Sequence, residues 1–259
     1  MTRFPQIGSG SIAQYPFGRV RRWRSITNQM ESGELIRLAD NTTDEIAWRL
    51  SYEELTDAEA SALTDLFASV NGRFGAFLFI DPMANLLGWS EDLSRPDWQA
   101  GLLQISAGAT DPLGTLRAWS LHNTAAGTLE IQQSIAMPGD YTGCFSAWMR
   151  SSTAATVVLG RDALAVSCAV GPVWKRFSVR GSGGAGAGQS TFSLSVAAGQ
   201  AIDVWGLQAE AQPYASQYKQ SASATGIYGE TYFADDELRM VSTGVGRTSC
   251  EIRLTSRVH

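Results

Sequence analysis

The sequence is poor in cysteine and histidine and contains no long apolar run. Its three cysteines, Cys144, Cys168 and Cys250, are odd in number and far apart, which fits neither a disulfide framework nor a zinc site. We therefore expect buried free thiols and no metal. No apolar run approaches the roughly 18 residues that a membrane-spanning helix needs, and the N-terminus lacks the apolar core of a signal peptide. The expectation is a protein made and kept in a cytoplasm, without membrane insertion.

Catalytic constellations are missing as well. Neither of the two histidines, His122 and His259, has neighbours in a pattern typical of a base or a metal ligand. Two carboxylate groups, Glu91-Asp92 and Asp235-Asp236-Glu237, are candidates for glycosidase acids or calcium ligands, but both lie in predicted turns, where carboxylates are usually solvated, and no calcium-loop spacing is present. The chain also lacks a nucleophile elbow with triad partners and a dinucleotide fingerprint. We expect no enzyme activity and no cofactor.

The composition favours a β-rich protein of two domains. The chain has 259 residues, more than one domain usually holds. Hydrophobic residues make up 44% of it, enough for real cores, and abundant small residues suit many strands and turns. The net charge of −5 gives no global reason to expect binding to nucleic acid or to an anionic membrane.

The stretch from Ile46 to Asp81 has the pattern of strand, helix and strand. Residues 46–52 alternate between apolar and polar side chains, as a half-buried strand does. Thr56 and Glu59 then form a capping box. An apolar helix face follows, at Leu63, Leu66, Phe67 and Val70. The nearly all-apolar residues 75–80 predict a strand that is buried on both faces.

The segments before and after this module are predicted to complete its sheet. Residues 19–24 and 34–38 predict a pair of strands, and Asp40–Asp44 is a polar cluster that predicts a turn. Near the C-terminus, three further strands are expected, at residues 227–233, 238–241 and 250–254. Because three strands are marginal alone, we expect residues 1–84 and 219–259 to form one discontinuous α+β hub domain with a single main helix.

Residues 85–218 have a different pattern of apolar and polar residues, which predicts no long helix. Short alternating runs, separated by turn signals, are typical of an antiparallel β-sandwich or jelly roll inserted into the hub. Eight strands are predicted, at residues 102–105, 116–121, 128–135, 142–149, 155–159, 173–180, 191–196 and 201–207.

Two groups of side chains are candidates for binding. Arginines cluster in an otherwise acidic protein, at Arg19, Arg21, Arg22 and Arg24. They can pair with carboxylates of a neighbouring subunit, line a DNA channel, or form a locally paired edge strand. The densest run of carboxylates in the same domain gives candidate partners in a subunit contact: Asp235, Asp236 and Glu237. In the insert, tryptophans can stack on sugar rings or fill the core, and the candidates for stacking are Trp119, Trp148 and Trp174.

The insert resembles a carbohydrate-binding-like jelly roll that recurs in bacteriophage tail and appendage proteins. Its opening, residues 85–93 (NLLGWSEDL), is followed by Trp98, and its closing, residues 202–210 (IDVWGLQAE), is followed by residues 213–218 (PYASQY). The sequence departs from the pattern at Gln217, between Ser216 and Tyr218, and at Ala209, where a second Leu is common.

The flanking domain resembles the hub of a phage distal tail protein. The matching features are Phe4-Pro5, the helix over 56–70, Arg73–Phe77, Phe79-Ile80-Asp81, Asp236-Glu237-Leu238 and Ile252-Arg253-Leu254. This resemblance implies a structural ring, usually hexameric, that joins the tail tube to the tip or baseplate and passes DNA through its lumen. The jelly roll would project outward, toward host glycans or neighbouring tail proteins. Assembly in the host bacterial cytoplasm and a final place in the virion tail are implied too. The alternative is a tail-tip or appendage adhesin outside the central ring, whose jelly roll binds carbohydrate.

Overall fold

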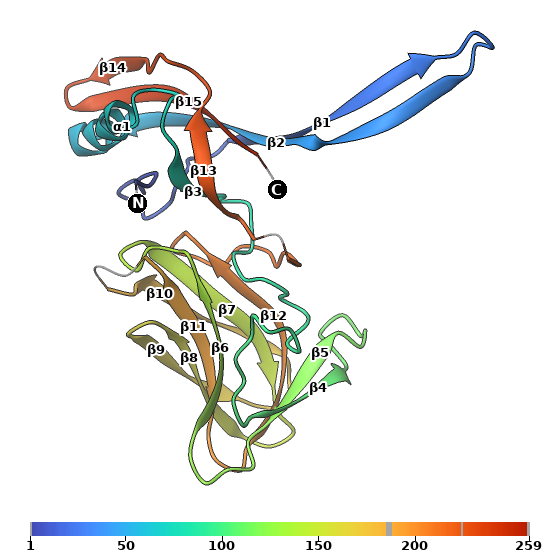
Figure 1. Cartoon of the computed structure of the whole chain (residues 1–259). Helices are drawn as coiled ribbons and strands as arrows, with labels where there is room; N and C mark the ends of the chain where they lie inside the picture. The colour runs from blue at the N-terminus through green and yellow to red at the C-terminus, as the bar shows by residue number, and fades with distance from the viewer. Residues whose placement is uncertain (1, 185–187, 224, 258–259) are drawn as a thin grey trace. The chain divides into compact units, whose positions relative to one another are not determined.

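The computed structural model describes residues 2–184, 188–223 and 225–257, apart from the side chains of 41–43 (Figure 1). The chain forms two compact units, each of which we describe by itself. Unit 1 comprises residues 1–8, 12–79 and 228–259, and unit 2 comprises residues 9–11 and 80–227. In the described ranges the protein is mainly β with one helix and antiparallel sheets, which confirms the predicted fold class. None of the helical residues described there forms a helix long and apolar enough to cross a membrane.

Unit 1 is built on one sheet with strand order β1-β2-β15-β13-β3, and β14 pairs with β15. The strands are β1 (Gly18–Gln29), β2 (Leu35–Leu55), β3 (Phe77–Ile80), β13 (Ile227–Phe233), β14 (Met240–Gly244) and β15 (Arg247–Arg257). The core is aromatic: Trp48 packs on Phe79 with ring centroids 4.8 Å apart, and Phe4 meets the same ring edge-on at 5.4 Å. The buried Tyr52 hydroxyl donates to the carbonyl of Ile12 at 2.6 Å.

Helix α1 (Asp57–Ser69) begins at the predicted capping box. Thr56 Oγ1 accepts from the Glu59 amide at 3.4 Å, and Glu59 Oε2 accepts from the Thr56 amide at 2.7 Å. The helix buries Leu63 and Leu66. Phe67 is only half-buried and meets Phe233 edge-on at 5.0 Å, so Phe67→Ala should cost less than the roughly 3–5 kcal/mol that is typical of a fully buried ring.

Stability of unit 1 should fall in acid partly through Glu59. Burial raises the pKa of this carboxyl, but hydrogen bonds from Thr56 and Gly8 outweigh burial and leave the pKa lowered. The carboxylate therefore stabilises the fold fully above the ordinary glutamate pKa, about 4.3, and less as pH falls through the lowered value. Glu59→Gln should cost more stability at pH 7 than at pH 3 in urea unfolding. Equal costs at both pH values would contradict this assignment.

The outer part of the β1–β2 hairpin stands apart from the sheet core. All residues from 18 to 39 are exposed, and the ribbon extends beyond the other strands of unit 1 (Figure 1). The turn predicted at Asp40–Asp44 is wrong, since β2 runs through these residues. The register explains the polar cluster. Arg22 of β1 pairs with Glu45 of β2, and Arg24 pairs with Asp40. The single residue between the two arginines therefore lies opposite four residues of β2, 41–44. The cluster therefore forms a bulge rather than a turn.

Unit 2 is a sandwich of two antiparallel sheets. One sheet has the order β10-β7-β12-β5-β4 and the other β6-β11-β8-β9. The strands are β4 (Gln104–Ala109), β5 (Ala118–His122), β6 (Leu129–Ile135), β7 (Thr142–Arg150), β8 (Ala155–Arg161), β9 (Leu164–Val170), β10 (Lys175–Ser182), β11 (Ser190–Val196) and β12 (Ala201–Glu210). The core between the sheets includes Phe145 and Phe192, which are fully buried with ring centroids 5.4 Å apart. Strand β9 was not among the eight predicted strands.

The opening and closing motifs of the insert are hydrogen-bonded to each other. Asn85 Nδ2 donates to the carbonyls of Leu207 and Lys219, at 2.9 and 3.0 Å, and Asn85 Oδ1 accepts from the amide of Ala209 at 3.1 Å. In the closing motif, Gln208 Oε1 accepts from the Lys219 amide at 2.7 Å. The motif residues thus hold together the two segments by which the chain enters and leaves the sandwich.

The predicted domain limits, 84 and 219, lie within unit 2, close to the residues where its main segment begins and ends. The amide of Asp81 donates to the carbonyl of Gly226 at 2.8 Å, so these flanking segments pair with each other. A hub of 1–84 and 219–259 with 85–218 inserted remains a proposal about independently folding domains. Excision of the insert, with a Gly-Ser link joining 84 to 219, is the experiment that tests it.

Candidate functional site

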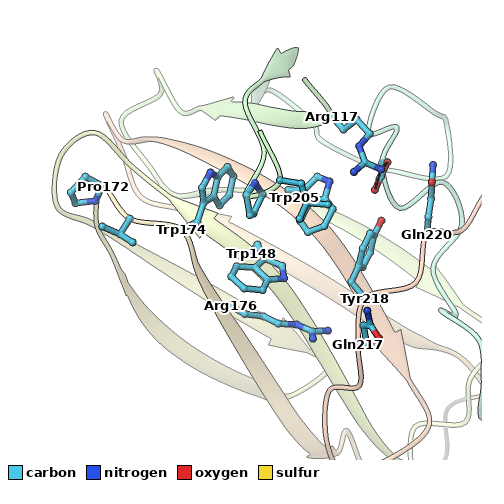
Figure 2. A pocket seen from close by; sticks show the side chains of 13 residues that line it. Arg117, Trp148, Pro172, Trp174, Arg176, Trp205, Gln217, Tyr218 and Gln220 are labelled. Atoms are coloured by element: carbon cyan, nitrogen blue, oxygen red, sulfur yellow. Dashed lines mark hydrogen bonds and ion pairs between the residues drawn. The ribbon is translucent and has the colours of Figure 1, made fainter. Parts of the chain in front are cut away.

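A cleft of about 940 Å³ lies on the five-stranded sheet of unit 2 (Figure 2). Three of its lining side chains form a row because their strands pair in register: Arg176 on β10 is paired with Trp148 on β7, and Trp148 with Trp205 on β12. Antiparallel partners point to the same face of a sheet. Ala147 and Met149 are fully buried, so the alternating side chain of Trp148 points to the opposite face. The cleft therefore has two indoles in its floor and a guanidinium beside them.

Trp205 and Tyr218 form the inner part of the floor. Trp205 is only 6% exposed, and its ring centroid lies 4.7 Å from that of Tyr218. The phenol of Tyr218 shares a 2.9 Å hydrogen bond with Ser90, and burial raises its pKa far above the usual range, which keeps it neutral. Gly206 permits this packing: its φ is +65°, and a Cβ there would lie 3.2 Å from Trp148 and 3.4 Å from Tyr218.

Trp174, just before β10, contacts the guanidinium of Arg150, which is itself held in place by a carboxylate. The guanidinium carbon of Arg150 lies 4.9 Å from the ring centroid of Trp174. Arg150 Nε donates to Asp203 Oδ2 at 2.9 Å, and Asp203 Oδ1 accepts from the Ser120 hydroxyl at 2.6 Å. This chain of contacts sets the orientation of the indole in the cleft wall.

Of the three predicted stacking tryptophans, the structure brings Trp148 and Trp174 together and leaves Trp119 apart. Trp119 on β5 is paired with Val204, which is fully buried, so Trp119 lies on the core face of the sheet. Its Nε1 donates to the carbonyl of Glu91 at 2.9 Å. Trp119 is not a lining residue of the cleft.

Arg117 lies at the far end of the floor, where two carboxylates balance its charge. Its guanidinium carbon lies 5.7 Å from the ring centroid of Trp205, and Figure 2 shows it beyond Trp205 and above Tyr218. Nε of Arg117 is 3.3 Å from Asp111 Oδ2, and Nη1 is 3.4 Å from Glu91 Oε2. The charge at this end is therefore largely neutralised within the protein.

The cleft also contains hydrogen-bond donors that the protein does not use. Within the described part of the chain, Nε1 of Trp174, Nε1 of Trp205 and Nε of Arg176 are buried and have no hydrogen-bond partner. A buried donor without a partner costs about 1–3 kcal/mol. The accessible surface of the cleft combines indole faces with the guanidinium of Arg176, so the cleft is suited to a ligand with both an apolar face and acceptor oxygens.

The candidate acids and the thiols are not placed or ionised in a way that is typical of catalytic groups. A hydrogen bond from Ser94 lowers the pKa of Asp92, which also pairs with Arg95 at 2.7 Å, so Asp92 stays ionised. The cysteines are free and buried, as predicted, and burial raises the pKa of both Cys144 and Cys250 to about 11. His122 is exposed at the end of β5, and His259 lies outside the described residues. No cluster of His, Cys, Asp and Glu able to hold a metal occurs among the described residues.

The predicted subunit-contact arginines have partners within their own chain. Arg21 pairs with Asp44, Arg22 with Glu45 at 2.7 Å, and Arg24 with Asp40 at 3.9 Å. The hydrogen bond from Arg21 lowers the pKa of Asp44. Arg19, on the same strand, also has an interaction partner.

The predicted acidic partners are likewise engaged elsewhere. Asp235 pairs with Arg253 at 2.9 Å and Asp236 with Arg73 at 2.8 Å, while Glu237 is exposed. The structure therefore favours the local-pairing alternative for most of these residues, and their role in a subunit contact stays a prediction.

The cleft residues that were not among the named stacking candidates include Trp205, Tyr218, Arg117 and Arg176. Trp205 and Tyr218 belong to the closing motif, so that motif was the available signal. The two arginines had no signal of their own, because only the pairing of β10, β7 and β12 places Arg176 next to an indole.

No protein-family model and no curated protein matches this sequence. Among solved structures, the enzymatically active domain of tailspike protein 4 of bacteriophage CBA120 is similar at 14% identity and a TM-score of 0.38, over 51% of this chain and 21% of that one. TmCBM61, solved with β-1,4-galactotriose, has 15% identity and a TM-score of 0.37, over 48% and 97%. The CBM22-1 xylan-binding domain of Paenibacillus barcinonensis Xyn10C has 13% identity and a TM-score of 0.40, over 54% and 99%. Because these scores are low, we base the function on the residues of the cleft.

Proposed function

We propose that unit 2 binds carbohydrate in its aromatic cleft, and that the chain serves as an adhesin of a phage tail tip or appendage. The observation that carries the proposal is the floor of Trp148 and Trp205, with Trp174 in the wall and polar groups at both ends. A sugar ring has an apolar C–H face that packs on an indole, and hydroxyls that bind to surrounding polar groups. The place in a phage tail rests on the motif resemblance of the insert and of the flanking domain.

The principal test is Trp148→Ala. Loss of a central aromatic anchor typically costs about 2 kcal/mol or more, so binding to a glycan should weaken roughly thirtyfold. Affinity gel electrophoresis against a panel of neutral and acidic bacterial and plant polysaccharides measures the effect. Tyr214→Ala is the matched control, because Tyr214 is an exposed aromatic of the same unit that does not line the cleft. Binding that survives Trp148→Ala unchanged would remove the cleft from the proposal.

We expect binding without turnover. Glu91, the carboxylate that lines the cleft, is paired with Arg117, and Asp92 is held ionised, so neither is placed as a general acid. The pure protein should release no reducing ends from any polysaccharide that it binds. Release that Glu91→Gln abolishes would overturn this expectation.

A second candidate function is assembly into the ring of a distal tail protein. The exposed hairpin of unit 1 favours it, since a two-stranded ribbon with apolar side chains is marginally stable in water by itself. In this proposal unit 1 joins six copies of the chain into a ring between the tail tube and the tip or baseplate, with DNA passing through the lumen. The ring, its copy number and its neighbours rest on the motif resemblance alone.

A further inference from the structure

The two arginines that border the aromatic floor differ in how their charges are balanced. Arg117 lies against two carboxylates, those of Asp111 and Glu91. Arg176 donates only to neutral oxygens, through Nη1 to the carbonyl of Ser216 at 2.5 Å and through Nη2 to the hydroxyl of Ser146 at 2.9 Å. In the ranges that the structure describes, no carboxylate pairs with Arg176. The half-buried cation at this end of the cleft therefore has no direct carboxylate partner among the described residues, whereas Arg117 has two.

Arg176 also has hydrogen-bond donors that are not used within the protein. A guanidinium has five N–H donors, and the bonds to Ser146 and Ser216 use two of them. The Nε donor has no partner among the described residues. The charged residues of the lining are Arg117, Arg176 and Glu91, and Asp111 also lies against Arg117. Because two carboxylates balance Arg117, the positive end of the cleft is at Arg176, in a chain with a net charge of −5.

We infer that the cleft binds an acidic glycan, one whose sugar carries a carboxylate, with the sugar ring on Trp148 and the carboxylate against Arg176. The two residues are paired across neighbouring strands, where side chains on one face lie roughly 5 Å apart, so a substituent on a ring stacked on Trp148 reaches the guanidinium. A planar guanidinium matches a carboxylate in geometry and in charge. This inference rests on the proposed function and specifies the class of ligand.

The test compares polygalacturonate with its carboxyl-reduced form, which keeps the linkages and converts each carboxylate to a neutral alcohol. Affinity electrophoresis and calorimetry of the full chain should show tighter binding to the acidic polymer, by roughly ten- to a hundredfold, since a charge-assisted hydrogen bond contributes that much. Arg176→Gln should remove the preference, so that the variant binds the acidic and the reduced polymer with equal affinity. Arg180→Gln removes an equal charge from the same strand outside the cleft and should leave the preference intact.

Each outcome bears on a separate claim. Equal or tighter Trp148-dependent binding of the reduced polymer would overturn the acidic ligand and leave carbohydrate binding standing. An acidic preference that persists in Arg176→Gln would overturn the role of Arg176. If Arg176→Gln loses its fold by circular dichroism, Arg176→Met takes its place, and it should likewise lose the preference for the acidic polymer; a preference that persists in Arg176→Met would overturn the role of Arg176. Absence of Trp148-dependent binding to both polymers, and to the wider panel, would contradict the proposed function together with this inference.

Discussion

Arg161→Ala is expected to destabilise unit 2 by about 3–5 kcal/mol, because it removes a large buried side chain and two hydrogen bonds to buried carbonyls. Arg161 ends strand β8 with a fully buried side chain. Its Nη2 donates to the carbonyl of Tyr141 at 2.8 Å, and its Nη1 donates to the carbonyl of Gly181. Burial lowers the pKa of this guanidinium, opposed by the nearby carboxylate of Asp162. Alanine would leave a cavity and two carbonyls without their donor.

Arg161→Met is the matched variant for this experiment. Methionine fills most of the same volume without a charge, so only the two carbonyls lose a partner, and the loss of stability should be clearly smaller. Urea unfolding followed by tryptophan fluorescence measures both variants, because most of the tryptophans lie in unit 2. If Arg161→Ala unfolds at the same urea concentration as the parent, the buried arginine does not hold these loops together.

Local signals predicted the elements whose formation depends on local contacts. The capping box of Thr56 and Glu59 lies within four residues, and helix α1 begins where it predicts. Alternating side chains likewise predicted eight of the strands in unit 2. Strand β9 was missed because most of its side chains are exposed, so the apolar periodicity that identifies a half-buried strand is weak there.

Features that depend on distant residues could not be predicted in this way. A charged residue at a strand end normally predicts exposure, yet Arg161 is buried because the loops at Tyr141 and Gly181 bring carbonyls to it. The polar cluster at 40–44 has the composition of a turn, but its pairing with β1 makes it a bulge. In the cleft, Trp148 was a candidate from composition alone, whereas the register with β10 decides that Arg176 lies beside it.

Removing the apolar face of the β1–β2 hairpin is expected to abolish self-association of the chain. In the outer ribbon, Ile26 is paired with Leu38 and Asn28 with Ile36, so the three apolar side chains lie on one face. They are between 41% and 52% exposed, and nothing in the described part of unit 1 covers them. A long exposed ribbon with an apolar face usually marks an interaction site or an aggregation risk.

The triple variant Ile26→Ser, Ile36→Ser and Leu38→Ser isolates this face better than charge reversal at Arg21 and Arg22. Those arginines already pair with Asp44 and Glu45, so reversing them would also break contacts within the chain. Sedimentation velocity should show the parent as a defined oligomer and the triple variant as a monomer that keeps the circular dichroism spectrum of the parent.

The control for this experiment changes Thr27 and Gln29 to serine, on the opposite face of the same ribbon. It should assemble like the parent, because apolar area supplies most of the affinity of such a contact and exposed polar groups supply little. A parent that stays monomeric at every concentration would count against the ring. A triple variant that still assembles would move the contact away from the hairpin. Because these residues lie on an exposed ribbon, loss of assembly with an unchanged circular dichroism spectrum can be assigned to the contact itself.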